Sequence, residues 1–102
     1  MTQAYWVNVF RSVSDAEKLA ASVELAESVM TDHGGRFLAR GVPAAAFEAG
    51  ELERTVIIEF PSIDAGVAAY ESTAYQAALE ALDGGAERDI RIIAAMDGGV
   101  EG

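Results

Sequence analysis

The sequence contains no cysteine and only one histidine, His33. Without cysteine the 102-residue chain forms no disulfide, offers no thiolate nucleophile and cannot hold a cysteine-ligated metal cluster. A single imidazole is also too few for a histidine-rich zinc site. We therefore expect neither a metal nor any other cofactor.

Positive charge is scarce as well. Seven lysines and arginines stand against seventeen aspartates and glutamates, which gives a formal net charge of −10. Such a field repels both the phosphate backbone of nucleic acid and anionic lipid. We expect no nucleic-acid partner and no membrane partner.

Long apolar runs are missing too. None approaches the roughly 18 residues that a membrane-spanning helix needs. The N-terminal "MTQAYWVNVFR" lacks the basic start and apolar core of a signal peptide. The length and these absences predict a single cytoplasmic domain over residues 1–102, in which the acidic "DGGVEG" at 97–102 is a flexible tail.

Two periodicities alternate along the rest of the chain. Alternating aromatic and β-branched residues predict strands, and apolar residues three to four apart predict helices. Capping boxes beginning at Ser14 and Thr73, and a capping serine at Ser62, mark helix starts, so the second helical region should restart near Ser72. The expected strands cover 4–11, 36–40, 54–60 and 88–96, with a further short strand near Phe47, and the expected helices cover about 14–34 and 62–83.

This β-α-β-β-α-β order is typical of a ferredoxin-like α+β fold, an antiparallel sheet with both helices on one face. The third strand is apolar on both faces, with Val56 and Ile58 on one side and Ile57 on the other. A sheet with one face in water should alternate more cleanly. We therefore expect a homodimer that covers the second face, a dimeric α+β barrel.

The stretch "DHGGRFLARG" (32–41) could be a phosphate loop, a catalytic site or a helix end. A phosphate loop follows a strand and opens a helix, whereas these glycines follow a helix, so we interpret them as its end. His33 then either caps helix carbonyls or donates a proton. Arg36 and Arg40 are four apart, which predicts one shared strand face where they could clamp a carboxylate or form structural ion pairs.

Two further groups could line a pocket. Trp6 and Asn8 share a face of the first strand, and buried Asn8 would need a hydrogen-bond partner from the backbone or a ligand. Tyr70 and Tyr75 flank the expected restart and could present phenols to a small organic ligand. In each case ordinary core packing is the competing interpretation.

The segments "GGRFLARG", "ERTVIIEFPS" and "YESTAYQAA", after an N-terminal "AYW", resemble the domain-of-unknown-function family 1330 of the dimeric α+β barrel superfamily. The similarity runs from about Ala4 to Met96. It implies a ferredoxin-like protomer that pairs its sheet with a twin, and a cleft between sheet and helices. Two positions depart from the family. Leu82 stands where the family usually has an arginine, whose place Arg88 or Arg91 could take, and Val42 stands where the family usually has a glycine.

Three functions follow as hypotheses, and whether the protein is an enzyme stays open. The first is a homodimeric protein that binds a small organic or anionic ligand. The second, which the superfamily suggests, is a cofactor-independent monooxygenase or isomerase acting on an aromatic or enol-like substrate. The third is a structural or stress-related dimer. The candidate ligand-binding residues are Arg36, Arg40, Tyr70, Tyr75 and Trp6, and the candidate catalytic residues are His33 and Asn8.

Overall fold

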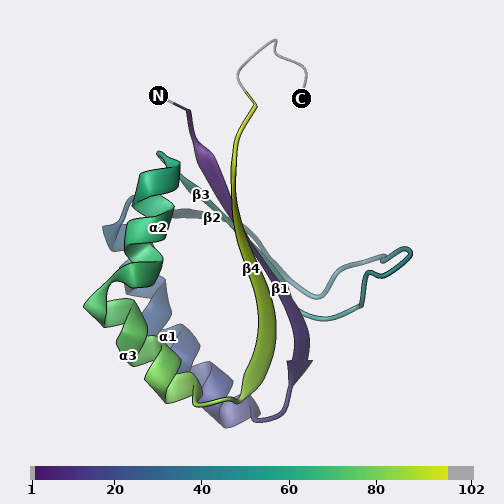
Figure 1. The fold of residues 1–102 in the computed structure, drawn as a ribbon. Coiled ribbons are helices and arrows are strands. Elements are labelled where there is room, and N and C mark those ends of the chain that lie inside the picture. Colours follow the sequence, from purple (N-terminus) through teal and green to yellow (C-terminus); the bar gives the residue numbers. More distant parts are fainter. Residues whose placement is uncertain (1, 97–102) are drawn as a thin grey trace.

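The computed structural model describes residues 2–96, and its elements follow the expected order, with the second helical region in two pieces (Figure 1). The predicted flexible tail at 97–102 lies outside the described residues. Within the described part, no helix has both the length and the apolar character needed to cross a bilayer. The elements are β1 (Ala4–Val13), α1 (Ala16–Asp32), β2 (Arg36–Gly41), β3 (Thr55–Phe60), α2 (Ile63–Glu71), α3 (Thr73–Leu82) and β4 (Ala86–Ala94).

The four strands form one antiparallel sheet in the order β2-β3-β1-β4, with all three helices on one face (Figure 1). Trp6 lies opposite Ile58 on one side and Ile92 on the other, so β1 runs through the centre of the sheet. The fold is the predicted ferredoxin-like α+β fold. Its core lies between the sheet and the helices, and its largest fully buried side chains are Trp6, Phe10 and Phe60.

Both predicted capping boxes are displaced by one residue. The Asp15 side chain, not that of Ser14, accepts hydrogen bonds from the backbone N–H groups of Glu17 and Lys18. Ser72 separates α2 from α3, and its hydroxyl, not that of Thr73, accepts from the N–H of Tyr75. Aspartate and serine are both strong helix caps, so the neighbouring residue performs the same task. The predicted restart near Ser72 is confirmed.

The glycine pair ends α1, as predicted. Gly34 has φ of 85°, a left-handed backbone that favours glycine at the end of a helix. Gly35 donates a backbone hydrogen bond to Met30 O, and a Cβ atom placed on it would lie only 2.7 Å from that oxygen. The pair therefore turns the chain tightly from α1 into β2. The element directly before it is a helix, whereas a phosphate loop would follow a strand.

Residues 42–54 connect β2 to β3 as a long arm that extends away from the helices (Figure 1). The short strand expected near Phe47 is not formed, so that prediction is wrong. Phe47 is 80% exposed and has no core contact to hold it in a sheet. The arm leaves the sheet beside Arg40 and returns beside Arg54, which places an arginine at each end of its base.

Candidate functional site: a polar cavity between the sheet and the helices

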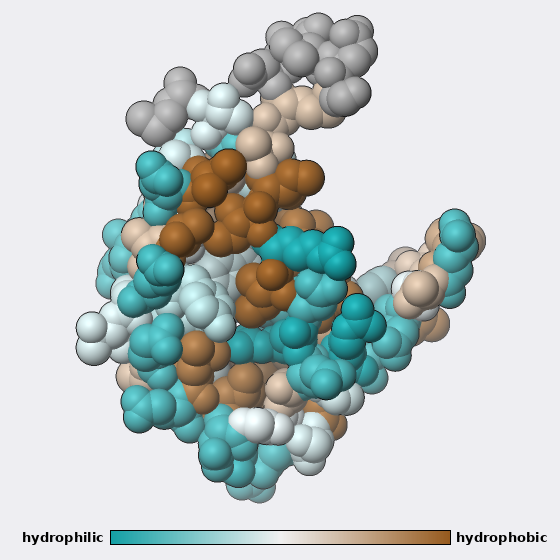
Figure 2. All heavy atoms as spheres, in the orientation of Figure 1, coloured by the Kyte–Doolittle hydropathy of each residue, from teal (hydrophilic) through white to brown (hydrophobic). Residues whose placement is uncertain are grey.

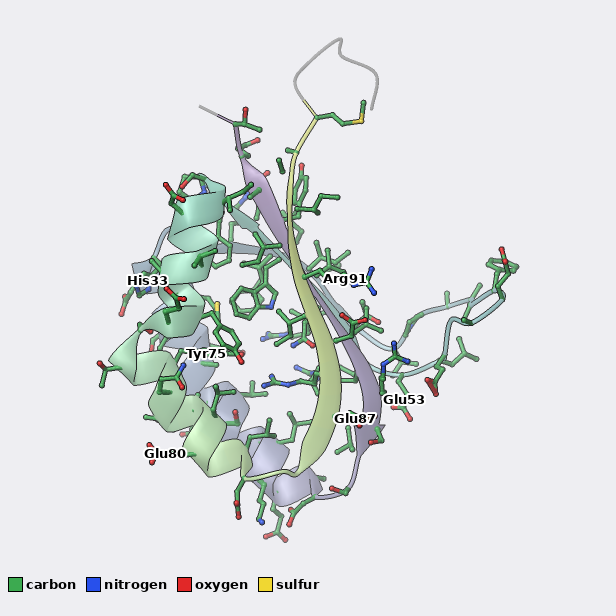
Figure 3. The ribbon with its side chains drawn as sticks, in the orientation of Figure 1. His33, Glu53, Tyr75, Glu80, Glu87 and Arg91 are labelled. Atoms are coloured by element: carbon green, nitrogen blue, oxygen red, sulfur yellow. The ribbon has the colours of Figure 1, made fainter. Side chains whose placement is uncertain are left out.

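A cavity of about 50 Å³ lies inside the protomer, between the inner face of the sheet and helices α1 and α3. Strand β1 supplies one wall because alternation points three consecutive inner residues at the helices. Tyr75 approaches from α3, with its ring turned toward the sheet (Figure 3). Residues from β1 and the helices that line the cavity include Trp6, Asn8, Phe10, Ser22, Met30 and Tyr75.

Two buried polar atoms at this cavity have no hydrogen-bond partner among the described residues, Asn8 Oδ1 and Arg54 Nε. Asn8 is only 7% exposed and lies among Trp6, Phe10 and Ile90 in the core layer. A buried polar group without a partner costs about 1–3 kcal/mol, and such groups are rare in folded proteins. The pair therefore marks the part of the core where polar groups are left for something else to satisfy.

Two arginines hold their guanidinium groups at Phe10. The guanidinium carbons of Arg54 and Arg88 each lie 5.8 Å from the centroid of this buried ring. Arg88 lies directly opposite Phe10 in the β1–β4 pairing, and the backbone oxygen of Arg54 accepts a hydrogen bond from Phe10 N–H. Because an aromatic face attracts cations, Phe10 positions both charges at the cavity.

Arg40 lies at the side of the cavity nearest α1. It forms an ion pair with Glu27 of α1, and its guanidinium carbon lies 5.0 Å from the centroid of the Phe37 ring. Both Arg40 and Glu27 line the cavity. Glu27 therefore already neutralises Arg40, whereas Arg54 and Arg88 have no ion-pair partner among the described residues.

The aromatic residues form one connected cluster beside the cavity. Trp6 packs edge-on against Tyr75 with 5.6 Å between ring centroids, and Tyr70 lies 5.0 Å from Tyr75. Burial raises the pKa of the Tyr75 hydroxyl, and the nearby Arg88 guanidinium partly opposes that rise. Tyr75 is therefore a neutral hydroxyl at physiological pH, able both to donate and to accept a hydrogen bond.

An open groove of about 590 Å³ adjoins this cavity at the β4 edge of the sheet. Its lining is mainly apolar, and Arg88 lines both the groove and the cavity. Tyr70, 37% exposed, also lines the groove while its ring contacts Tyr75. Figure 2, in the orientation that has β4 in front, shows apolar side chains gathered along the seam between α2 and β4, where the groove is lined by Val67, Ile90 and Ile92.

Arg36 does not join the site, although sequence spacing predicts that it shares a face with Arg40. The β2–β3 register shifts between Phe37 and Ala39, so Arg36 pairs opposite Glu59 and Arg40 opposite Val56. Those two partners lie on opposite faces of β3. The β-bulge turns Arg40 toward the cavity and leaves Arg36 on the outer face, in an ion pair with Glu59 at 3.0 Å.

His33 also lies outside the site. It is the C-terminal capping residue of α1, and its Nδ1 lies 2.9 Å from Val29 O. It is not among the residues that line the cavity. The imidazole therefore does not reach the groups around Asn8, and among the described residues no cluster of acidic or histidine side chains could hold a metal ion.

The cavity brings together Trp6, Asn8, Tyr75 and Arg40 from the predicted candidates, with Tyr70 behind Tyr75. Of the two suggested substitutes for the missing family arginine, Arg88 lines the cavity, whereas Arg91 faces outward and pairs with Asp89 (Figure 3). Sequence reasoning missed Arg54. The signal was present, because Arg54 precedes Val56 by two residues and so shares its inward face.

This arrangement defines the class of protein: a ferredoxin-like α+β protomer of the type found in dimeric α+β barrel proteins. The chain belongs to the family described as Domain of unknown function (DUF1330), whose model matches residues 3–96. Comparison with curated protein sequences found no match.

Solved structures share this fold at low sequence identity. RPA0582, a protein of unknown function from Rhodopseudomonas palustris, superposes with a TM-score of 0.73 at 17% identity, covering 94% of this chain and 84% of that one. SnoaB, a cofactor-independent oxygenase from Streptomyces nogalater, gives 0.65 at 16% identity, covering 95% and 96%. A dimeric protein of unknown function with a ferredoxin-like fold from Bacteroides fragilis gives 0.53 at 12% identity, covering 91% and 96%. At these identities the likeness concerns the fold alone.

Proposed function

We propose that this protein is a homodimeric small-molecule-binding protein, and that each protomer binds its ligand in the cavity between sheet and helices. The observation that carries the proposal is the pair of buried, unpartnered polar atoms, Asn8 Oδ1 and Arg54 Nε, at one cavity. A ligand supplies the hydrogen bonds that the described residues leave unmade. A purely structural dimer would have no use for polar groups left unpaired inside its core.

The outer face of the sheet supports the homodimer. Val7 lies opposite Ile57, and Tyr5 lies opposite Ile93, so apolar side chains run across the centre of a face that no helix covers. Ion pairs lie among them, Arg36 with Glu59 and Arg91 with Asp89. A self-complementary mixture of apolar area and paired charges suits a two-fold interface between identical sheets.

Native mass spectrometry of the purified protein tests the assembly and any retained ligand in one spectrum. We expect a dimer, and Val7→Arg should convert it to monomer because it places a charge at the centre of the interface. Leu25→Arg is the matched control, since Leu25 is 46% exposed on α1, on the helical side of the protomer, and its substitution should leave the dimer intact. A monomeric unmodified chain would contradict the proposed interface.

Binding at the cavity is tested by the shift in melting temperature across a library of small organic molecules. Ligands that stabilise the chain should lose at least half of their shift in Asn8→Leu, which removes the unpartnered amide while keeping an apolar side chain of similar size. Asn8→Leu alone should raise the melting temperature because it removes a buried unpartnered amide, so each variant is compared with its own ligand-free value. If no compound stabilises the unmodified chain, the binding function fails.

A second candidate function is a cofactor-independent oxygenase acting on an aromatic or enol-like substrate. The observation in its favour is that Asn8, Trp6 and a neutral Tyr75 hydroxyl line one cavity of a fold shared with SnoaB. His33 does not line this cavity, so of the two predicted catalytic candidates only Asn8 lines it. Oxygen uptake with dihydroxyaromatic compounds, measured in the presence of a metal chelator and without added flavin, tests the oxygenase function. An uptake rate that Asn8→Leu leaves unchanged would contradict it.

A further inference from the structure

We infer that the cavity and its adjoining groove select one class of ligand: a small hydroxycarboxylic acid, with a carboxylate and a nearby hydroxyl on a short apolar or aromatic body. This inference rests on the proposed binding function and specifies its ligand. It follows from three properties of the described residues, namely the charge at the cavity, the type of each unpartnered atom and the division of space between cavity and groove.

The charge at the cavity calls for an anionic group on the ligand. Three of the seven basic residues, Arg40, Arg54 and Arg88, line this one cavity of a chain whose net charge is −10. Glu27 is the acidic residue among the lining side chains, and it pairs with Arg40. Three arginines against one glutamate leave a formal surplus of two positive charges, held by Arg54 and Arg88 at the face of Phe10.

A carboxylate fits the two guanidinium groups that have no ion-pair partner among the described residues better than a neutral polar group does. Half-buried guanidiniums lose hydration, and an anion that accepts hydrogen bonds from them restores the lost interaction. The planar fork of arginine matches the two oxygens of a carboxylate, and Arg54 Nε is a buried donor still without an acceptor. The acid end of the ligand is therefore placed at Arg54 and Arg88.

The second unpartnered atom requires a donor on the ligand. Asn8 Oδ1 is an acceptor, and an ionised carboxylate has no hydrogen to offer it. A hydroxyl group close to the carboxylate donates to Asn8 while the carboxylate accepts from Arg54. Because both unpartnered atoms line the same small cavity, the two functional groups must lie within a few bonds of each other on the ligand.

Space separates the polar end of the ligand from its body. The inner cavity of about 50 Å³ holds a head group of a few atoms, whereas the groove of about 590 Å³ is within the usual range for an organic ligand. Val67, Ile90 and Ile92 make most of the groove lining apolar, Glu71 is its acidic residue, and Arg88 lines both spaces. The body of the ligand therefore lies in the groove, between α2 and β4.

The experiment is isothermal titration of the unmodified dimer with sets of compounds that differ in one group. 2-Hydroxy-3-phenylpropanoate carries both groups, 3-phenylpropanoate lacks the hydroxyl, and 3-phenylpropane-1,2-diol lacks the charge. Lactate, mandelate and salicylate vary the body, and inorganic phosphate supplies charge without an apolar body. We expect a hydroxycarboxylate to bind best, and removal of either group to weaken binding about tenfold or more.

Variants assign each group to its partner. Arg54→Gln and Arg88→Gln should each weaken the hydroxycarboxylate about tenfold or more, while leaving the diol unchanged. Arg91→Gln is the matched control, because it removes the same charge from the outer face of β4. Asn8→Leu should make the compounds with and without the hydroxyl bind equally, and Asn8→Ser, which keeps a hydroxyl in place of the amide, provides a second test if the leucine variant does not fold.

The outcomes separate the two proposals. Neutral compounds that bind as tightly as the acids, or acid binding that Arg54→Gln and Arg88→Gln leave intact, would overturn the ligand class while the binding function stands. Phosphate binding as tightly as the hydroxycarboxylates would also overturn it, because charge alone would then explain the affinity. If neither these acids nor any neutral compound binds, both the ligand class and the proposed binding function fail.

Discussion

Phe10 and Arg88 lie directly opposite each other on β1 and β4, and the Arg88 guanidinium carbon lies 5.8 Å from the centroid of the buried Phe10 ring. Arg54 lies at the same distance from that ring. One phenyl group therefore both fills the core and contacts the two guanidinium groups at the cavity that have no ion-pair partner among the described residues. The packing of the core and the charge of the site depend on the same side chain.

Phe10→Leu should lower the free energy of unfolding by on the order of 1–3 kcal/mol, because it removes buried ring atoms and the aromatic face that the guanidiniums contact. Urea denaturation measures the change. Phe47→Leu is the control, since Phe47 is 80% exposed on the arm, and it should shift stability by less than about 0.5 kcal/mol. Equal effects of the two substitutions would contradict the assignment of Phe10 to the core.

The contribution of the ring to the charges can be separated from its burial. In a double-mutant cycle with Phe10→Leu and Arg88→Gln, we expect a coupling energy of about 0.5–1 kcal/mol, the usual size of a cation–π contact. The cycle of Phe10→Leu with Arg91→Gln should give a coupling near zero, because Arg91 lies on the other face of the sheet. If the effects of Phe10→Leu and Arg88→Gln are strictly additive, the contact between the Phe10 ring and Arg88 does not contribute to stability.

Ser22 forms a buried hydrogen bond, here called the Ser22 tie, between α1 and α3. It is 3% exposed, and its hydroxyl donates a 2.7 Å hydrogen bond to Ala78 O. Ser22→Ala should cost about 0.5–1.5 kcal/mol, read as a lower urea midpoint with an unchanged slope. Ser28→Ala on the exposed side of α1 should stay within about 0.5 kcal/mol, and a Ser22 variant that matches it would mean that the tie adds no stability.

The glycine pair in "DHGGRFLARG" can be tested by comparison with Gly84. A Cβ on Gly35 would meet Met30 O at 2.7 Å and the Phe60 ring at 3.0 Å, whereas one on Gly84 meets no heavy atom within 4 Å. Gly84→Ala should cost about 1–2 kcal/mol through its φ of 72° alone. Gly35→Ala should cost more, because backbone must move, and a smaller loss at Gly35 would contradict the tight turn.

The sequence predicts most of this fold because alternation and helical periodicity are direct consequences of burial on one face. The inward set Trp6, Asn8 and Phe10 follows from alternation alone, and so does the inward position of Arg88 two residues before Ile90. The resemblance of the sequence motifs adds the family, whose model matches residues 3–96. The helix starts were displaced by one residue because Ser14 and Asp15 are both good caps, and only the backbone decides between them.

The sequence did not predict that Arg36 and Arg40 lie on opposite faces of the sheet, because their separation depends on an irregularity of the backbone. Arg36 and Arg40 are an even number of residues apart, and alternation places them together only if no residue is inserted between them. The β-bulge between Phe37 and Ala39 inserts one, and no residue type at Leu38 signals it. Bulges are set by how two strands pair, which is a property of the folded sheet rather than of one segment.

The alkaline limit of stability should depend on Tyr75. Burial raises the pKa of its hydroxyl above the ordinary value of about 10, with Arg88 partly opposing the rise. Because the pKa in the folded chain exceeds that in the unfolded chain, the contribution of Tyr75 to stability is complete below about pH 10 and is lost as the pH rises through the folded value.

Tyr75→Phe cannot ionise, so its stability should fall less than that of the unmodified chain over this range. Urea midpoints from pH 9 to 11.5 measure the difference, and the absorbance difference at 295 nm between the two proteins follows the phenolate itself. If both proteins lose stability equally with rising pH, the Tyr75 hydroxyl is more hydrated than the burial of its ring against Trp6 indicates.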